Sequence, residues 1–252
     1  MDPTSVFVAA LVCLFGSSMG GLLLFKYFPP PHRSEETRHV IRSIAGIFVT
    51  MTALVMGLMI NTAKTRFDGI NRDLHSYATN LILLDRTLVT FGPGTTETRA
   101  RLQAYVARAA GKGSFVNNDP LFVSDLTSEQ MLNAVGEALR AIAPDTNQSL
   151  AVWNDARREY GKIVELRWAL VEQAESSIPP PLLVLVICWL VLVFGSYGYG
   201  APSNATVVMS LLLAAALIAA ALDLTTDLDL PYSGYISVSP APLQRALAEL
   251  RR

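Results

Sequence analysis

Four windows of this sequence are apolar and free of charge, and they constrain the fold more than any other feature. They are Ser5–Phe25, Ile44–Ile60, Leu182–Phe194 with a Gly/Tyr-rich extension to Tyr199, and Ala205–Leu222. A helix needs roughly 17–25 mostly apolar residues to cross a bilayer. Only 16% of the residues are charged, whereas a soluble domain carries about 25%. We therefore predict an all-α polytopic membrane protein with four transmembrane helices.

The segments between these windows divide the chain into four parts. Residues 1–62 hold the first two spans, and residues 63–177 form a soluble block inserted between the second and third spans. Residues 178–230 hold the last two spans, and residues 231–252 form a C-terminal tail. The prolines of Ser176–Pro181 mark the return to the membrane, because consecutive prolines stop an incoming helix.

The soluble block has the apolar periodicity of helices. After the second span, apolar residues recur at steps of three and four, which is a heptad seam. The seam consists of Phe67, Ile70, Leu74, Tyr77, Leu81, Leu84 and Leu88. We expect this helix to end at Phe91–Gly94, and others to cover Thr96–Ala110, Thr127–Ala141 and Asn147–Ser176. The apolar face of the last helix is Trp153, Ala156, Tyr160, Ile163, Leu170 and Ala174. Gly234–Ser239 is the one stretch with a strand-like pattern.

The tail is predicted to contain a short amphipathic helix. Leu243, Ala246, Leu247 and Leu250 share one face of it. Such a helix can lie on a lipid surface or dock on the soluble block, and its shortness favours docking.

Several function classes find no support in the sequence. The net charge of −1 argues against a nucleic-acid partner, because such proteins carry basic patches. Cys13 and Cys188 both lie inside predicted spans, so neither a disulfide framework nor a CxxC metal site is indicated. No P-loop or HExxH motif is present. We therefore expect no catalytic residues, no cofactor, no confident metal site and no enzyme.

The second span carries a continuous line of small and polar residues. They step by three or four, so they share one face of a helix that continues past the membrane. The line is Ser43, Gly46, Thr50, Ala53, Gly57, Asn61, Lys64, Asp68, Asn71 and His75. In a ring of such helices this face would line a pore. The alternative is close helix packing, because small residues let backbones approach each other.

Two further features have a structural and a functional interpretation. Asp223, Asp227 and Asp229 stand at or just beyond the end of the fourth span. Solvation at the membrane interface explains them most simply, and a cation site is the alternative. Gly16-Ser-Ser-Met-Gly20 in the first span has the GxxxG spacing, which we interpret as a helix-packing motif.

Six sequence blocks, in order, resemble one bacterial membrane family. They are EETRHVIRSIAGIF, LVMGLMINTAKTRFD, LLDRTL, SSIPPPLLVLVICWLVLVFGSYG, APSNATVV and LDLPYSGYISVSPAPL. The family is long catalogued as being of unknown function and is called bestrophin-like. Bestrophins are pentameric anion channels with two spans, a helical cytosolic block, two more spans and a cytosolic tail. The second span lines their pore.

The resemblance implies the orientation and the pore residues. It supports a cytoplasmic soluble block and cytoplasmic termini in the bacterial inner membrane, where the positive-inside rule points in the same direction. The pore-lining set is Ser43, Gly46, Thr50, Ala53, Leu54, Gly57, Ile60, Asn61 and Lys64, in which Leu54 and Ile60, with Ile47 added, would line a hydrophobic constriction. Arg66, Asp68 and Arg72 would set ion selectivity in a vestibule, and Asp223, Asp227 and Asp229 are sparser than the calcium-binding run of animal bestrophins.

The sequence thus favours a homo-oligomeric ion channel that conducts small anions, with membrane lipid and copies of itself as partners. Lys64 and Arg66, repeated around a ring, would raise the local anion concentration. Asp68 and Asp73 oppose that effect. The alternative is a non-conducting membrane scaffold or sensor whose soluble helices bind a partner. Oligomeric state separates the two, because a monomer cannot surround a pore with one helix.

Overall fold

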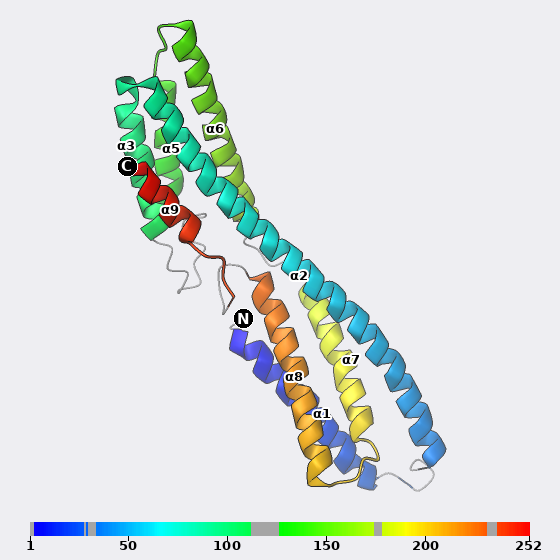
Figure 1. Ribbon diagram of the computed structural model, residues 1–252. Coiled ribbons are helices and arrows are strands. Elements are labelled where there is room, and N and C mark those ends of the chain that lie inside the picture. Colours follow the sequence, from blue (N-terminus) through cyan, green and yellow to red (C-terminus); the bar gives the residue numbers. More distant parts are fainter. Residues whose placement is uncertain (1–2, 28, 30–33, 112–125, 174–177, 231–235) are drawn as a thin grey trace. The chain divides into compact units, whose positions relative to one another are not determined.

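The computed structural model describes the chain except residues 1–2, 28, 30–33, 112–125, 174–177 and 231–235. The described residues contain eight α-helices and no strand (Figure 1). The all-α prediction is therefore confirmed. Of the strand-like stretch Gly234–Ser239, residues 236–239 are irregular and the others lie outside the described residues.

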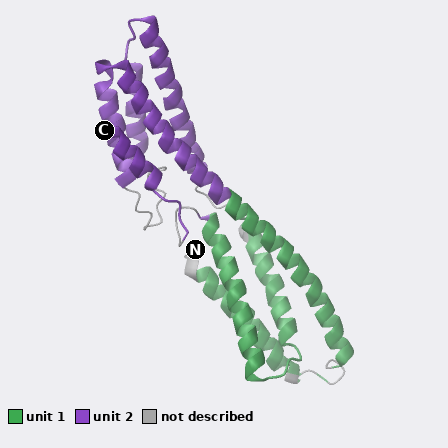
Figure 2. Cartoon of the chain, in the orientation of Figure 1, with its two compact units in different colours: residues 1–65, 176–229 green, residues 66–175, 230–252 purple. Residues whose placement is uncertain are grey.

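The chain forms two compact units (Figure 2). Unit 1 comprises residues 1–65 and 176–229, and unit 2 comprises residues 66–175 and 230–252. One helix, α2 (Glu35–Phe91), begins in unit 1 and ends in unit 2. Its 57 residues far exceed the roughly 20 that cross a bilayer.

Unit 1 contains helices that are long and apolar enough to span a membrane. They are α1 (Pro3–Leu24), the first part of α2, α7 (Pro180–Gly198) and α8 (Ala205–Asp229). Their shared core is formed by Ala10, Leu14, Met59, Val186, Leu190, Phe194, Ala215, Ala219 and Leu222. Phe48 of α2 lies beside Trp189 of α7, with ring centroids 6.4 Å apart. A membrane segment gains little from hydrophobic burial, so these helices are held together by close packing and hydrogen bonds.

The closest packing in unit 1 joins α1 to α7, and glycines make it possible. A Cβ on Gly21 would collide with the carbonyl oxygen of Gly195, and a Cβ on Gly198 would collide with the backbone of Ser18. Ser17 Oγ donates a hydrogen bond of 2.6 Å to the Val191 carbonyl at the same contact. The small residues therefore bring two backbones together.

The GxxxG glycines that the sequence singled out do not make this contact. A Cβ at Gly16 or Gly20 would meet no atom within 4 Å. Their interpretation as a packing motif is wrong within the protomer. Gly16 and Gly20 do share one face of α1, but α7 packs on a different face, which carries Gly21.

Unit 2 is a helical bundle whose helices match the predicted ones closely. It contains the second part of α2, α3 (Thr96–Gly111), α5 (Leu126–Arg140), α6 (Asn147–Glu172) and α9 (Ala241–Leu250). In unit 2 a short 3₁₀ turn, η3 (Pro93–Thr95), precedes α3, and in unit 1 another described turn, η1 (Phe25–Tyr27), follows α1. Gly92 has φ of 105°, a conformation that glycine adopts readily, and it separates α2 from η3. Thr146 and Ser149 form a capping box at the start of α6.

The heptad seam of α2 forms the centre of the unit 2 core. Ile70, Leu74, Tyr77, Leu81, Leu84 and Leu88 are all buried, and Phe67 packs at the edge. The tail helix α9 docks on this core through Leu243, Ala246 and Leu250. Gln103 of α3 donates a hydrogen bond of 2.6 Å to the Leu250 carbonyl. Docking, and not a position on the lipid surface, is therefore the observed arrangement.

Candidate functional site

Helix α2 presents distinct faces within unit 1. The buried face is Ala45, Thr52, Met59 and Ala63, which recur at steps of seven and four. This face packs against the other helices of unit 1, where Val55 and Met56 extend the contact. Because the buried positions repeat regularly, the exposed positions fall on fixed faces as well.

All nine predicted pore-lining residues are exposed in the protomer: Ser43, Gly46, Thr50, Ala53, Leu54, Gly57, Ile60, Asn61 and Lys64. At about 100° per residue, the small and polar members lie roughly 140° around the helix from the buried face. The side chain of Leu54 is 76% exposed, the highest value among the large apolar residues of α2. Ile47 is exposed as well. The line thus points away from the other helices of unit 1.

Close packing within the chain does not explain the two glycines of this line. A Cβ at Gly46 or Gly57 would meet no atom within 4 Å. The Thr50 hydroxyl donates a hydrogen bond of 3.0 Å to the Gly46 carbonyl of its own helix. This back-bonding satisfies the hydroxyl proton locally, and the oxygen remains on the exposed face.

A third face of α2 is apolar and also exposed. It carries Val40, Ile44, Met51 and Leu58. On an α-helix the buried face then has the polar line on one side and these apolar residues on the other. Such a face suits lipid, or an apolar neighbour, and it provides matched control positions for the polar line.

The residues predicted to set selectivity differ in their surroundings. Asp68 and Arg72 are exposed. Arg66 is half-buried and its guanidinium donates a hydrogen bond of 2.9 Å to the Gln173 carbonyl. Gln173 caps the C-terminus of α6 and its amide donates to Asp73 at 2.9 Å. A cation at a helix C-terminus is favourable, so Arg66 has a structural role in unit 2.

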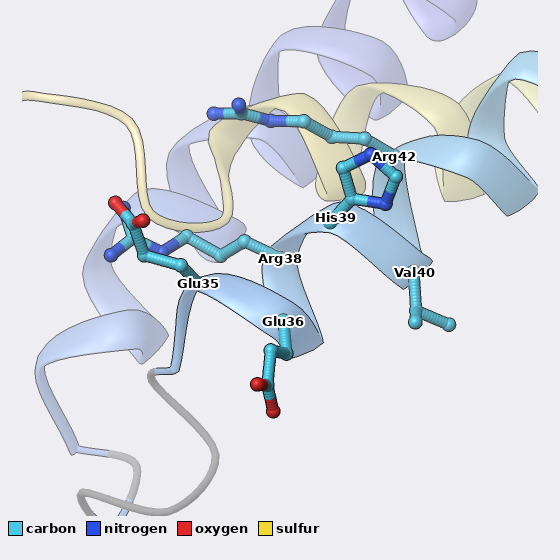
Figure 3. Close-up of a pocket in the computed structure, with 6 residues that line it drawn as sticks. All are labelled: Glu35, Glu36, Arg38, His39, Val40 and Arg42. Carbon is cyan, nitrogen blue, oxygen red and sulfur yellow. The ribbon is translucent and has the colours of Figure 1, made fainter.

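A shallow pocket lies at the N-terminal end of α2. It is lined by Glu35, Glu36, Arg38, His39, Val40 and Arg42. Arg38 and Arg42 extend to one side of the helix, whereas Glu36 and Val40 point to the other (Figure 3). His39 stands four residues before Ser43, so the polar line of α2 continues up to this end of the helix.

The three aspartates at the end of the fourth span lie inside α8, which continues to Asp229. Asp227 and Asp229 are only 3% and 2% exposed, so the expectation that they are solvated is wrong. The backbone N–H of Ile178 donates a hydrogen bond of 3.2 Å to Asp229 Oδ2. Among the described residues, no group of three His, Cys, Asp or Glu side chains is arranged to hold a metal ion.

The sequence matches the family described as "Bestrophin-like domain" over residues 12–243, which is most of the chain. The chain belongs to the bestrophin-like family. Solved structures of a bacterial bestrophin homolog from Klebsiella pneumoniae are similar in fold. A tryptophan-to-alanine variant gives a TM-score of 0.73 at 10% identity, covering 99% of this chain and 97% of that one. A structure from Zn-SAD phasing gives 0.70 at 10% identity, with 96% of each chain covered. No curated protein matches the sequence.

One buried polar cluster of this bestrophin-like chain was not found from the sequence. Arg167 is fully buried on α6, and the buried hydroxyls of Tyr77 and Tyr105 hydrogen-bond to each other. A signal for it exists in the heptad pattern. Arg167 stands four residues after Ile163 and three before Leu170, at a position where an apolar residue is expected. Because arginine is charged, the sequence pattern did not assign this position to the core.

Proposed function

We propose that this bestrophin-like chain forms a homo-oligomeric ion channel of the inner membrane, with α2 of each subunit lining an anion-conducting pore. One observation carries the proposal: the small and polar line of α2 is exposed in the protomer from Ser43 to Lys64. Asn61 and Lys64 are costly to place against lipid. A ring of subunits would turn this face toward water.

The other exposed surfaces of unit 1 fit a surrounding bilayer. Leu192 on α7 and Met209, Leu213 and Leu217 on α8 are exposed and apolar. Lipid is the partner that their chemistry suits. The same argument does not apply to the polar line of α2, and this difference between faces supports an oligomer with a polar centre.

The charges of α2 favour anions. Arg42 stands at its N-terminal end, and Lys64 stands at the other end of the apolar stretch. Repeated around a ring, these cations would attract anions. Glu35 and Glu36 in the first turn of α2 and Asp68, one turn beyond Lys64, oppose them. In this arrangement unit 2 and both termini are cytoplasmic.

Cysteine accessibility tests the pore face. Cys13 and Cys188 are exposed, so both are first replaced by alanine, and Thr50→Cys or Met51→Cys is then introduced. The two positions lie at the same depth on different faces of α2. A negatively charged thiol reagent is expected to block the current of the reconstituted Thr50→Cys channel and to leave Met51→Cys unchanged. Block at Met51 alone would place the pore on the apolar face.

Bilayer recording under asymmetric potassium chloride tests conduction and selectivity. A reversal potential near the chloride equilibrium supports the anion channel. Reversal near the potassium equilibrium would keep the channel and overturn its selectivity. Silence from well-folded oligomers, with and without calcium, would overturn the channel and favour the scaffold or sensor.

A further inference from the structure

The core of unit 2 contains a positive charge. Arg167 lies on α6 and is 2% exposed, between the buried apolar residues Ile163 and Leu170. Arginine keeps its proton in proteins at any ordinary pH, and its guanidinium offers five N–H donors and no acceptor. A buried charge of this kind is costly unless an opposite charge or several hydrogen bonds compensate it.

The described neighbours of Arg167 do not compensate its charge. No carboxylate oxygen of the described residues lies within 4.0 Å of its guanidinium nitrogens. Its Nε is buried and has no hydrogen-bond partner among them. The guanidinium lies near enough to the Tyr105 hydroxyl to lower its pKa, and it lies 5.6 Å from the ring centroid of Trp168. Both are neutral groups, so the site keeps a full positive charge.

The tyrosines cannot supply the missing negative charge. Burial raises the pKa of Tyr105 above its ordinary value, although the Arg167 guanidinium lowers it in part. The Tyr105 side chain is therefore a neutral hydroxyl that is linked by a hydrogen bond to Tyr77. Either hydroxyl can be the donor in this hydrogen bond, and when Tyr105 accepts it, the Tyr105 proton is available beside the guanidinium.

We propose that Arg167 and the Tyr105 hydroxyl bind one small monovalent anion, of the size and charge of chloride, inside unit 2. A single anion neutralises the guanidinium and accepts a hydrogen bond from the Nε–H of Arg167, which lacks a partner among the described residues. A divalent anion such as sulfate would leave excess negative charge in an apolar core. The site lies within one protomer and on different residues from the polar line of α2, so it does not depend on the proposed pore.

Anion-dependent stability tests the site on the purified full-length protein. The apparent Tm is measured with sodium chloride or bromide and with sodium gluconate at equal ionic strength. Chloride and bromide are expected to raise the Tm, by about 3–6 °C for each tenfold increase above the dissociation constant. Arg167→Met should remove this dependence. The control Arg158→Met removes the same charge from an exposed position of α6 and should keep it.

A conservative variant and a direct observation make the test independent of folding defects. Tyr105→Phe keeps the ring in the core and loses one hydroxyl, so we expect it to fold and to need about tenfold more chloride for the same shift. Bromide should give an anomalous diffraction signal beside the Arg167 guanidinium. Equal Tm values in chloride and gluconate, an unchanged dependence in Arg167→Met, or a carboxylate of the chain at this position would each overturn the proposal.

Discussion

Arg99 of α3 donates two hydrogen bonds to Asp85 of α2, from Nε to Oδ1 at 2.8 Å and from Nη2 to Oδ2 at 3.2 Å. The pair is asymmetric in its surroundings. The Asp85 side chain is 4% exposed and the Arg99 side chain is 31% exposed. The carboxylate is therefore inside the bundle, and the guanidinium is its main source of compensation. The same hydrogen bonds raise the pKa of Arg99.

This asymmetry predicts unequal effects of the two single substitutions. Arg99→Met leaves a buried carboxylate without its partner, which we expect to cost about 3 kcal/mol. Asp85→Asn leaves an arginine that can turn toward solvent, so we expect a cost of about 1 kcal/mol. Thermal unfolding followed by tryptophan fluorescence measures both. Arg158→Met, in an exposed pair, is the control and should shift the Tm little. Equal losses at Arg99 and Asp85 would contradict the argument.

Adjacent glycines of α1 provide a matched pair for the contact between α1 and α7. Gly21→Ala places a Cβ against the backbone of Gly195, whereas Gly20→Ala meets no atom within 4 Å. We expect Gly21→Ala to lower the Tm by several degrees because backbone atoms cannot yield easily. Gly20→Ala should be neutral or slightly stabilising, because alanine favours the helix. Heat stability of the detergent-solubilised protein distinguishes them, and a larger loss at Gly20 would place it in a contact between subunits.

The docked tail helix gives a prediction on the stability of unit 2. Leu243 of α9 is fully buried in the unit 2 core, so Leu243→Ala should cost about 2–5 kcal/mol. Gln244→Ala, at the next and exposed position, should change the stability little. Limited proteolysis reports the same difference, since a detached α9 would be removed before the rest of the chain is cut. Equal protease resistance of both variants would show that docking contributes little.

The pKa of Tyr105 predicts a loss of stability at high pH. Burial raises this pKa in the folded protein, and the unfolded value is about 10. The contribution of Tyr105 to the free energy of unfolding is therefore constant below about pH 10. It is lost as the pH rises from the unfolded toward the folded pKa, by up to about 1.4 kcal/mol per pH unit. Tyr105→Phe removes it, so the Tm should fall less steeply between pH 9 and pH 11 than in the wild type. Identical slopes would contradict a buried neutral Tyr105.

The periodic parts of the fold could be predicted from the sequence, and the parts that depend on distant partners could not. Leu74 and Leu81 were placed in the core because helical spacing alone decides which residues share a face. The contact of Gly21 with Gly195 could not be found this way, because nothing in a local pattern names a partner far along the chain. Arg167 was missed for a third reason. Its position belongs to the apolar face of α6, but a charged side chain is not expected in a core.

The candidate site shows the same division. Spacing placed Thr50 and Asn61 on one face of α2, and the structure shows that face to be exposed. The sequence also predicts that Lys64, at the end of the pore-lining set, and Arg66, in the vestibule, together attract anions. Their surroundings differ, because Arg66 donates to the Gln173 carbonyl and Lys64 is exposed. The hydrogen bond of Arg66 requires the C-terminus of α6 to lie beside Arg66, and local sequence patterns do not predict this contact.

Lys64 and Arg66 are therefore predicted to have different effects on the channel. Lys64→Gln removes an exposed charge from the polar line of α2, and we expect the reversal potential under asymmetric potassium chloride to move toward the potassium equilibrium. Arg66→Gln removes the hydrogen bond to the end of α6, so we expect a lower Tm and an almost unchanged reversal potential. Both variants lose one positive charge, so net charge is matched between them. Equal shifts in reversal potential would show that Arg66 also contributes to ion selectivity in the vestibule. If neither variant shifts the reversal potential, other residues set the selectivity.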